Sequence, residues 1–386
     1  MAWRDPVSSF SEFHVSPMSV INPSSASPPL SGSVLVLIQF DVCEELLLDR
    51  LQQAASARTV QLPSMKHSAP AYVRYQRPPI VERLETLILE SGERLEGEIK
   101  YYDYGVVSVV YQLPFSGDWE GLVQLASRWV WDVDFASHVE PIVRQKLQRA
   151  TSSMVKPYSR WLSEDYFIFH MREVSGWPTA EELVRDNGLR IAQIVRGDRL
   201  NLSSSECTEV LNSRISYYAS DATVIGWNAA FLYDSAAGAE TAIQLLEYAN
   251  SQLLEFRHYD ELLSGILDGV YDSLEQKKGT FARWRLARSA TQLHTVLLDV
   301  AELTERADNA IKFLSDMFAA RLYRLAAGKV GVPDYKHLVE RKLKTANDLY
   351  NYMVEQFNQS RAFFLEVTVV LILLIELFYL FKGKAI

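Results

Sequence analysis

The sequence predicts an α+β head with mixed α/β character, followed by a long helical hairpin and a C-terminal transmembrane helix. Three observations support this fold class. Between residues 34 and 234, short apolar runs typical of strands alternate irregularly with helical patterns. From Ala239 onward only helical periodicity is present, and residues 362–381 form one apolar run. The chain has 386 residues, of which 48% are hydrophobic and 23% charged, so it can bury a large core.

The first part of the head predicts a strand, a helix and a pair of strands. Residues 1–33 end in a Pro/Ser-rich stretch and contain no apolar core long enough for a secretory signal, which predicts a disordered arm. The run Val34–Phe40 indicates a buried strand, and leucines at helical spacing follow in Glu44–Ala55. Beyond a polar linker, Gly97–Tyr104 and Val106–Tyr111 are typical of paired strands on either side of Gly105.

The second part of the head contains two capping boxes. Thr179 with Glu182 opens one helix, for which Gly188 is the expected end, and Ser203 with Glu206 opens another that ends near Tyr218. The remaining expected elements are a helix at Trp119–Trp131 and strands at Tyr166–Val174, Leu189–Val195, Ala222–Trp227 and Ala230–Tyr233.

The C-terminal third predicts three helices and a seam for a facing helix. The first runs from Ala239 to about Glu275, and the second runs from a break at Lys277–Gly279 to about Ala327. The third begins after Gly328–Pro333. Its apolar residues alternate at intervals of three and four, which is typical of helices that pack along their length. The helix can bury this seam either against the hairpin or against copies of the chain, and we expect a homo-oligomer; the seam residues include Leu343, Tyr350, Met353 and Phe357.

The run Ala362–Phe381 predicts the membrane anchor. At about 1.5 Å per residue it covers about 30 Å, the thickness of a hydrocarbon core. Arg361, Lys382 and Lys384 close its two ends. Glu366 and Glu376 lie within it, and a carboxyl group at that depth requires a partner or a proton.

These segments divide the chain into six parts. The expected division is an arm at 1–33, the head at 34–234, the hairpin at 235–333, a stalk helix at 334–361, the transmembrane helix at 362–381 and a short basic tail at 382–386. Because no export signal precedes the head, we expect a single-pass protein whose head faces the cytosol. A mitochondrial inner-membrane location is less favoured, since Arg4 is the only basic residue of the arm.

Composition excludes several classes of partner. The formal net charge of −9 offers no overall attraction to nucleic acid, so no direct nucleic-acid ligand is expected. The two cysteines, Cys43 and Cys207, form neither a disulfide framework nor a zinc-spaced set. A reducing compartment fits this usage.

No local motif identifies a reaction. The sequence lacks the phosphate-binding, dinucleotide-binding, zinc-protease and nucleophile-elbow motifs, so no catalytic residue, cofactor or metal is predicted. Asp132 and Asp134 supply too few ligands for a cation. His170 is expected to be a satisfied core histidine and His258 a surface one, and the polar residues around His258 are expected to form a solvated helix face or bundle contacts.

Short motifs resemble the Required for Meiotic nuclear Division family, a domain-of-unknown-function family with bacterial, fungal and mitochondrial members. They are Asn358 with Arg361, Leu365–Glu366 and Ile375–Glu376 in the last helix, Tyr102–Val107 in the head, and Leu253–Leu263 in the hairpin. The resemblance implies a membrane-anchored oligomer without established catalytic residues. It also implies a protein partner in the translation machinery, because mitochondrial members support organelle translation. Val367 departs from the family pattern, which has an aromatic residue there.

The leading hypothesis is a membrane-anchored, self-assembling scaffold or adaptor without catalysis, whose partners are the lipid bilayer and copies of itself. One alternative is an oligomeric channel or transporter with Glu376 facing a pore. The other is a hydrolase or nucleotide-binding enzyme, whose site in the head would gather residues that are distant in the sequence.

Overall fold

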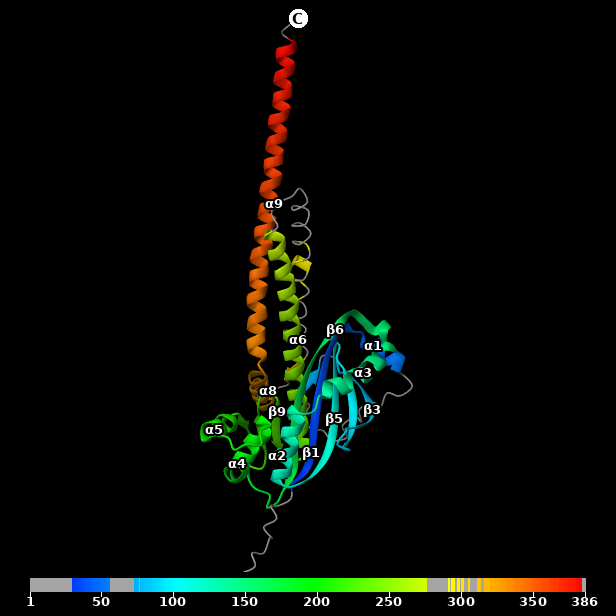
Figure 1. Ribbon diagram of the computed structural model, residues 1–386, viewed down its shortest axis with the longest axis vertical. Helices are drawn as coiled ribbons and strands as arrows, with labels where there is room; N and C mark the ends of the chain where they lie inside the picture. The colour runs from blue at the N-terminus through cyan, green and yellow to red at the C-terminus, as the bar shows by residue number, and fades with distance from the viewer. Residues whose placement is uncertain are drawn as a thin grey trace, which may run out of the picture.

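A computed structural model shows an α+β head from which two long helices project (Figure 1). The structure describes residues 30–55, 73–75, 77–275, 311–313 and 316–383, with residues 291, 293–295, 297–298, 300–301 and 305. Residues 1–29 of the arm predicted at 1–33 therefore lie outside the described residues, and its last four residues, 30–33, are the start of the first strand.

The head is built on an eight-stranded sheet of order β3-β4-β5-β1-β6-β9-β8-β7. Only β6 and β9 pair in parallel; the other neighbours are antiparallel. The strands are β1 (Leu30–Leu46), β3 (Ile80–Ile88), β4 (Arg94–Tyr101), β5 (Val106–Gly117), β6 (Met154–Val174), β7 (Arg214–Ile215), β8 (Ala222–Ile225) and β9 (Ala229–Tyr233). A separate two-stranded sheet pairs β2 (Val73–Tyr75) with β10 (Ile311–Phe313).

The central strand is β1, which lies between β5 and β6. Its alternate residues Val34, Val36 and Ile38 contribute to one core, while Leu35 and Leu37 contribute to a second core on the opposite face. Both faces are covered, so the strand has the continuous apolar run that predicted it. The expected strand at Val34–Phe40 is confirmed and is longer than expected.

One face of the sheet is covered by the shorter helices. They are α1 (Leu48–Ala55), α2 (Trp119–Trp131), α3 (Phe135–Gln148), α4 (Ala180–Arg196) and α5 (Ser204–Asn212), with a short 3₁₀ turn, η1 (Thr151–Ser153), before β6. The first core lies between these helices and the sheet, and it includes Trp129, Phe135 and Phe167. Trp129 and Phe135 meet edge to face with ring centroids 5.2 Å apart.

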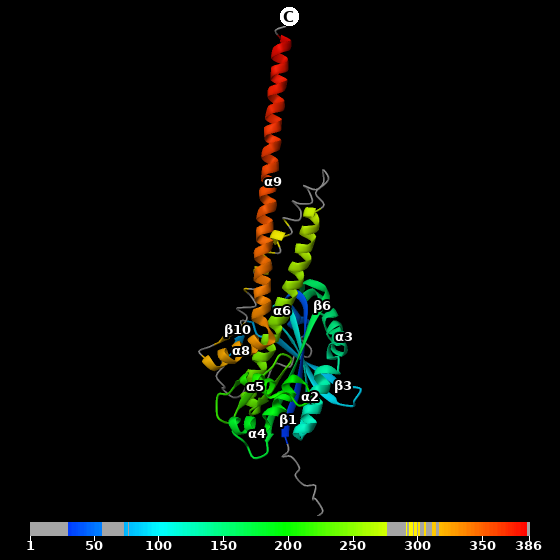
Figure 2. The same ribbon diagram turned by 60° about the vertical axis from the view of Figure 1, so that its left-hand side comes forward.

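The opposite face is covered by α6 (Ala236–Glu275), α8 (Met317–Val330) and α9 (Val332–Gly383). In both views α9 runs beside α6 and then continues beyond the rest of the molecule (Figures 1 and 2). The predicted break between the last two helices is confirmed, because α8 ends at Gly331, which has a φ of 94° and caps the helix.

Three expectations for the head are wrong. The helix opened by Ser203 ends at Asn212 instead of near Tyr218, and Arg214–Ile215 form β7. Leu189–Val195 is the second half of α4 instead of a strand, because Ile191, Ala192, Ile194 and Val195 lie on a buried helical face. Gly188 does not end the helix. A Cβ there would lie 2.9 Å from the Leu211 side chain of α5, so the glycine permits close helix packing, and Gly197 with φ of 65° is the observed end.

The hairpin differs from the expectation as well. The second helix was expected to reach Ala327 without interruption, but residues 311–313 form β10 and α8 begins after its N-cap, Asp316. Much of the expected second helix, including the break at Lys277–Gly279, lies outside the described residues.

The predicted transmembrane helix is wrong. Within the described part of the chain, no helix combines the length and the apolarity that crossing a bilayer requires. The last described side chains of α9, residues 365–382, include the charged residues Glu366, Glu376 and Lys382, and each charge is costly in hydrocarbon. The predicted single-pass localisation depended on this anchor and is therefore wrong. The alternative of a channel or transporter also required this helix to span the membrane.

Gly105 forms the turn between β4 and β5 and gives a test of the packing. Its φ is +92°, and a Cβ there would lie 1.8 Å from the backbone oxygen of Cys43. Gly92 has a similar φ of +86° but nothing within 4 Å of its Cβ position. We expect Gly105→Ala to lower the free energy of unfolding by about 3 kcal/mol or more, because β1 must move, and Gly92→Ala by about 1 kcal/mol. Chemical denaturation measures the free energy of unfolding of both variants. Equal losses of stability would contradict the close contact between Gly105 and Cys43.

Candidate functional site

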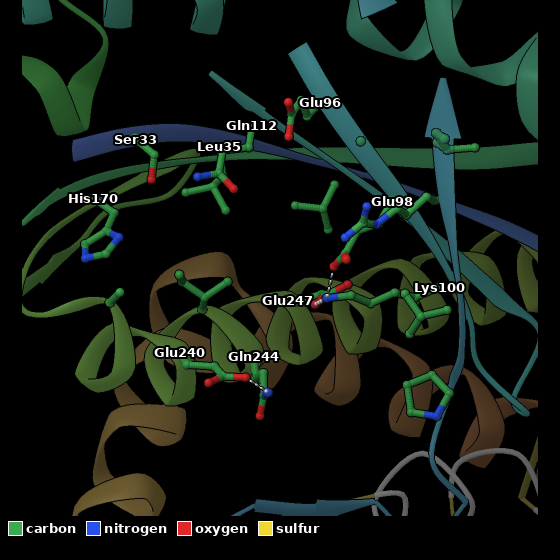
Figure 3. A pocket seen from close by; sticks show the side chains of 18 of the residues that line it. Ser33, Leu35, Glu96, Glu98, Lys100, Gln112, His170, Glu240, Gln244 and Glu247 are labelled. Carbon is green, nitrogen blue, oxygen red and sulfur yellow. Dashed lines mark hydrogen bonds and ion pairs between the residues drawn. The ribbon is translucent and has the colours of Figure 1, made fainter. Parts of the chain in front are cut away.

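One concave feature of the described residues is a groove between the sheet and the first turns of α6. It has a volume of about 1020 Å³. Its floor is formed by β1, β5, β4 and β3, and its wall by α6 (Figure 3). We call this feature the α6 groove.

The α6 wall follows from helical geometry. Glu240, Ile243, Gln244 and Glu247 are three or four residues apart, so they share one face of the helix and all line the groove. Glu98 and Lys100 come from one face of β4, since side chains two residues apart on a strand point the same way. Figure 3 shows Glu98 and Lys100 directed toward Glu247.

The deep end of the α6 groove holds two carboxylates and one ammonium. Lys100 Nζ lies 2.7 Å from Glu247 Oε2 and 3.3 Å from Glu98 Oε1. The Glu247 side chain is only 1% exposed, and its Oε1 has no hydrogen-bond partner. Gln39 Nε2 donates to the backbone oxygen of Glu247 over 2.9 Å and ties this turn of α6 to β1.

His170 lies at the other end of the groove. Its Nε2 is 2.9 Å from the backbone oxygen of Asp234, which can only accept, so the ring nitrogen donates. Burial lowers the pKa of His170, which favours the neutral ring. As expected from the sequence, it is a buried and satisfied histidine.

A second group of polar side chains is buried farther along α6. His258 Nδ1 lies 2.9 Å from Asp41 Oδ2 of β1, and the Tyr158 ring stacks on His258 with centroids 4.3 Å apart. Tyr259 donates its hydroxyl hydrogen to Glu255 Oε2 over 2.5 Å. We call these five residues the acid cluster. The expectation of a solvated face around His258 was therefore wrong at that residue, because the sheet covers it.

The two carboxyl groups of the acid cluster have raised pKa values. Burial raises the pKa of Glu255 well above its ordinary value, and the charge of Asp41 raises it further. Burial also raises the pKa of Asp41, against the opposing effect of His258. Burial raises the pKa of the neighbouring Cys43 thiol to about 12, so Cys43 is not a thiolate nucleophile near neutral pH.

The described residues contain no group of three or more His, Cys, Asp or Glu side chains placed to hold a metal ion. Asp132 and Asp134 instead lie at helix ends. Asp132 is the C-cap of α2, and the Asp134 side chain accepts from the backbone N–H of Ser137 at the start of α3.

The predicted assembly residues lie along α9. Met353 is buried against Leu267, Val270 and Leu293 of the same chain, and Leu343 and Tyr350 are partly buried. The first half of the seam is thus covered within one subunit.

The charged residues proposed at the ends of the apolar run are placed only in part. Glu366, Glu376 and Lys382 are exposed on the free end of α9. The side chains of Phe357 and Arg361, and all of Lys384, lie outside the described residues.

Comparison with known proteins identifies the head. The model of a family described as "Uncharacterized protein MJ0711, N-terminal domain" matches residues 31–240, more than half of the chain. The chain belongs to this family. The Uncharacterized protein MJ0711 of Methanocaldococcus jannaschii is 20% identical over 214 residues, which are 55% of this chain and 65% of that protein. The chain thus spans slightly less than two thirds of this relative. No solved structure matches.

The resemblance to the Required for Meiotic nuclear Division family is wrong. The MJ0711 N-terminal domain match begins with β1 and ends in the first turns of α6, so it includes the floor of the α6 groove and Asp41. Most of the resembling motifs lie in α6 and α9, outside the match. They are short and mostly apolar patterns on long helices, which unrelated helices share. The expected link to the translation machinery rested on that resemblance alone.

The acid cluster predicts a pH-dependent stability. Glu255 binds its proton more tightly in the folded chain, so the free energy of unfolding falls as the pH rises above 4.5, the ordinary pKa, toward the folded pKa. Glutamine has no proton to lose and its carbonyl oxygen can still accept from Tyr259. We therefore expect Glu255→Gln to gain stability relative to the wild type as the pH rises above 4.5.

Urea unfolding at several pH values measures this difference. Glu261→Gln, at an exposed position of the same helix, is the control and should keep the wild-type dependence. A Glu255→Gln variant that follows the wild type at every pH would contradict the assigned proton.

Proposed function

We propose that this chain is a self-assembling scaffold that joins copies of itself through residues 365–382 of α9 and displays the α+β head, without a catalytic step. The observation that carries the proposal is the exposed apolar end of α9. Leu371, Leu374 and Phe378 are 55%, 59% and 63% exposed, although helices that are apolar over most of their circumference are normally buried. Contiguous apolar surface of this kind is typical of interaction sites.

The partner that fits this surface is a second copy of the chain. Val339, Ala346 and Met353 belong to a seam of three-four spacing and pack within the subunit. The same spacing continues in Val367, Leu371, Leu374, Phe378 and Phe381. Inside the subunit this seam is covered by α6, which ends at Glu275. At residues 365–382 the same seam is exposed, and the same seam of another copy complements it.

The positions of the two glutamates on α9 are consistent with a seam that faces other copies of the chain. At about 100° per residue, Glu366 and Glu376, each five residues from Leu371, lie about 140° around the helix from it. When the seams of several α9 helices face one another, both carboxylates therefore point outward to water. Their burial cost in an assembly is small, whereas in hydrocarbon it would be large.

Matched substitutions on the two sides of α9 test the proposal. Leu374 lies on the seam and Leu373 on the glutamate side, and their exposures are 59% and 57%. We expect Leu374→Asn to raise the dissociation constant of the oligomer by at least about tenfold, because it places an amide in a buried contact, and Leu373→Asn to change it much less.

Sedimentation equilibrium of both full-length variants gives these constants. The helix propensity changes equally in the two variants, so a difference between them reports on the seam. The proposal is wrong if both variants dissociate equally or if the wild type is a monomer throughout.

A further inference from the structure

The α6 groove contains a buried carboxylate oxygen that the protein itself does not satisfy. Glu247 Oε2 accepts from Lys100, but Oε1 has no hydrogen-bond partner, although the side chain is 1% exposed. A buried carboxylate oxygen without a donor is costly, and native structures seldom keep one. Oε1 is itself enclosed, so a ligand in the groove supplies the missing donor when the Glu247 carboxylate rotates toward the groove that it lines.

The charge at the deep end favours a cationic donor. Glu98 and Glu247 share the single ammonium of Lys100, which leaves one uncompensated negative charge among the three groups. Glu240 adds another carboxylate on the α6 wall, and α6 contributes no cation to the groove. Arg83, which stands opposite Glu98 in the register of β3 and β4, and Arg172 also line it, but both are exposed at the rim, where water screens their charge.

The rest of the lining suits an aliphatic chain. Leu35 and Val110 rise from the floor, and Ile243 projects from α6 between Glu240 and Glu247. These side chains offer apolar contact for methylene groups beside the carboxylate. The volume of about 1020 Å³ exceeds that of a single metal ion or water and admits an elongated organic molecule.

We propose that the α6 groove binds an aliphatic primary amine, whose ammonium donates to Glu247 Oε1 and whose methylene chain lies along Leu35, Val110 and Ile243. Lys100 shows the same chemistry within the protein, since its own ammonium lies between Glu98 and Glu247. A second ammonium completes the charge balance of the three groups and satisfies the remaining oxygen. This proposal is independent of the self-assembly of α9, because the groove is formed within one chain.

Three probes of equal length distinguish this chemistry from others. Isothermal titration of the full-length protein with butylamine, butanoate and 1-butanol compares a cation, an anion and a neutral molecule with similar chains. We expect binding of butylamine and no measurable binding of the other two. Tighter binding of butanoate than of butylamine would indicate that the rim arginines recognise the ligand, and it would overturn the proposal. The absence of butylamine binding would overturn it as well.

Two variants locate the bound amine. Glu247→Gln removes the charge at the orphan oxygen, and Glu98→Gln removes a charge while leaving the Glu247–Lys100 pair in place. Each is expected to weaken butylamine binding at least about tenfold, because Glu247→Gln replaces the charged acceptor and Glu98→Gln leaves the Lys100 ammonium to neutralise Glu247 alone. Glu261→Gln, on α6 outside the groove, should bind as the wild type does.

Thermal unfolding of each variant is measured first, so that a loss of binding is not mistaken for a loss of fold. If the Glu247→Gln variant does not fold, the Glu98→Gln variant still tests the proposal. Unchanged affinity in a folded Glu247→Gln or Glu98→Gln variant would overturn the proposal.

Discussion

The contact between α6 and the sheet is the interaction on which the rest of the molecule depends. It combines an apolar core with a buried polar stripe along the helix, which runs from Glu247 through Ser251 and Glu255 to His258 at intervals of three and four residues. Glu247, Ser251 and His258 have partners outside α6, which are Lys100, Tyr104 and Asp41, so the helix is held in one position instead of sliding over an apolar surface. Moving α6 by one turn would leave several buried charges unpaired, which is strongly unfavourable.

The functional features follow from this contact. The first turns of α6 form the wall of the α6 groove, its middle closes over the acid cluster, and its last turns cover the beginning of α9. Because α9 is longer than the part that α6 covers, its apolar seam remains open at the end (Figure 2). Because α6 packs against both the sheet of the head and α9, it joins the head and α9 in one packed structure.

Much of the fold could be predicted because it is encoded locally. The apolar run of β1, the Gly105 turn and the capping box at Thr179 each depend on residues a few positions apart. The error at Leu189–Val195 arose because a short apolar run suits either a buried strand or a buried helix, and Gly188 was interpreted as an end when it allows close contact with Leu211. The apolar run in α9 predicted burial in lipid, whereas its charged residues are compatible with burial against other helices.

The candidate sites were not predictable in the same way. Gln39 and Glu247 are 208 residues apart, and Asp41 meets His258 only because strand alternation and helical spacing bring both to one interface. Neither Glu247 nor Glu255 belongs to a recognisable motif. The one available signal was the presence of polar residues at positions of β1 and α6 where the pattern required burial, and such residues are typically retained for a specific contact.

The central claim is that copies of the chain meet at the free end of α9, and energy transfer between labelled copies tests it most directly. A donor and an acceptor are attached in separate preparations at Leu373→Cys, on the outward side of the helix, with Cys207 replaced, and the preparations are mixed. The account predicts efficient transfer at residue 373 and weaker transfer when the labels are placed at Glu90→Cys in the head. Absence of transfer at residue 373, or stronger transfer from the head, would contradict it.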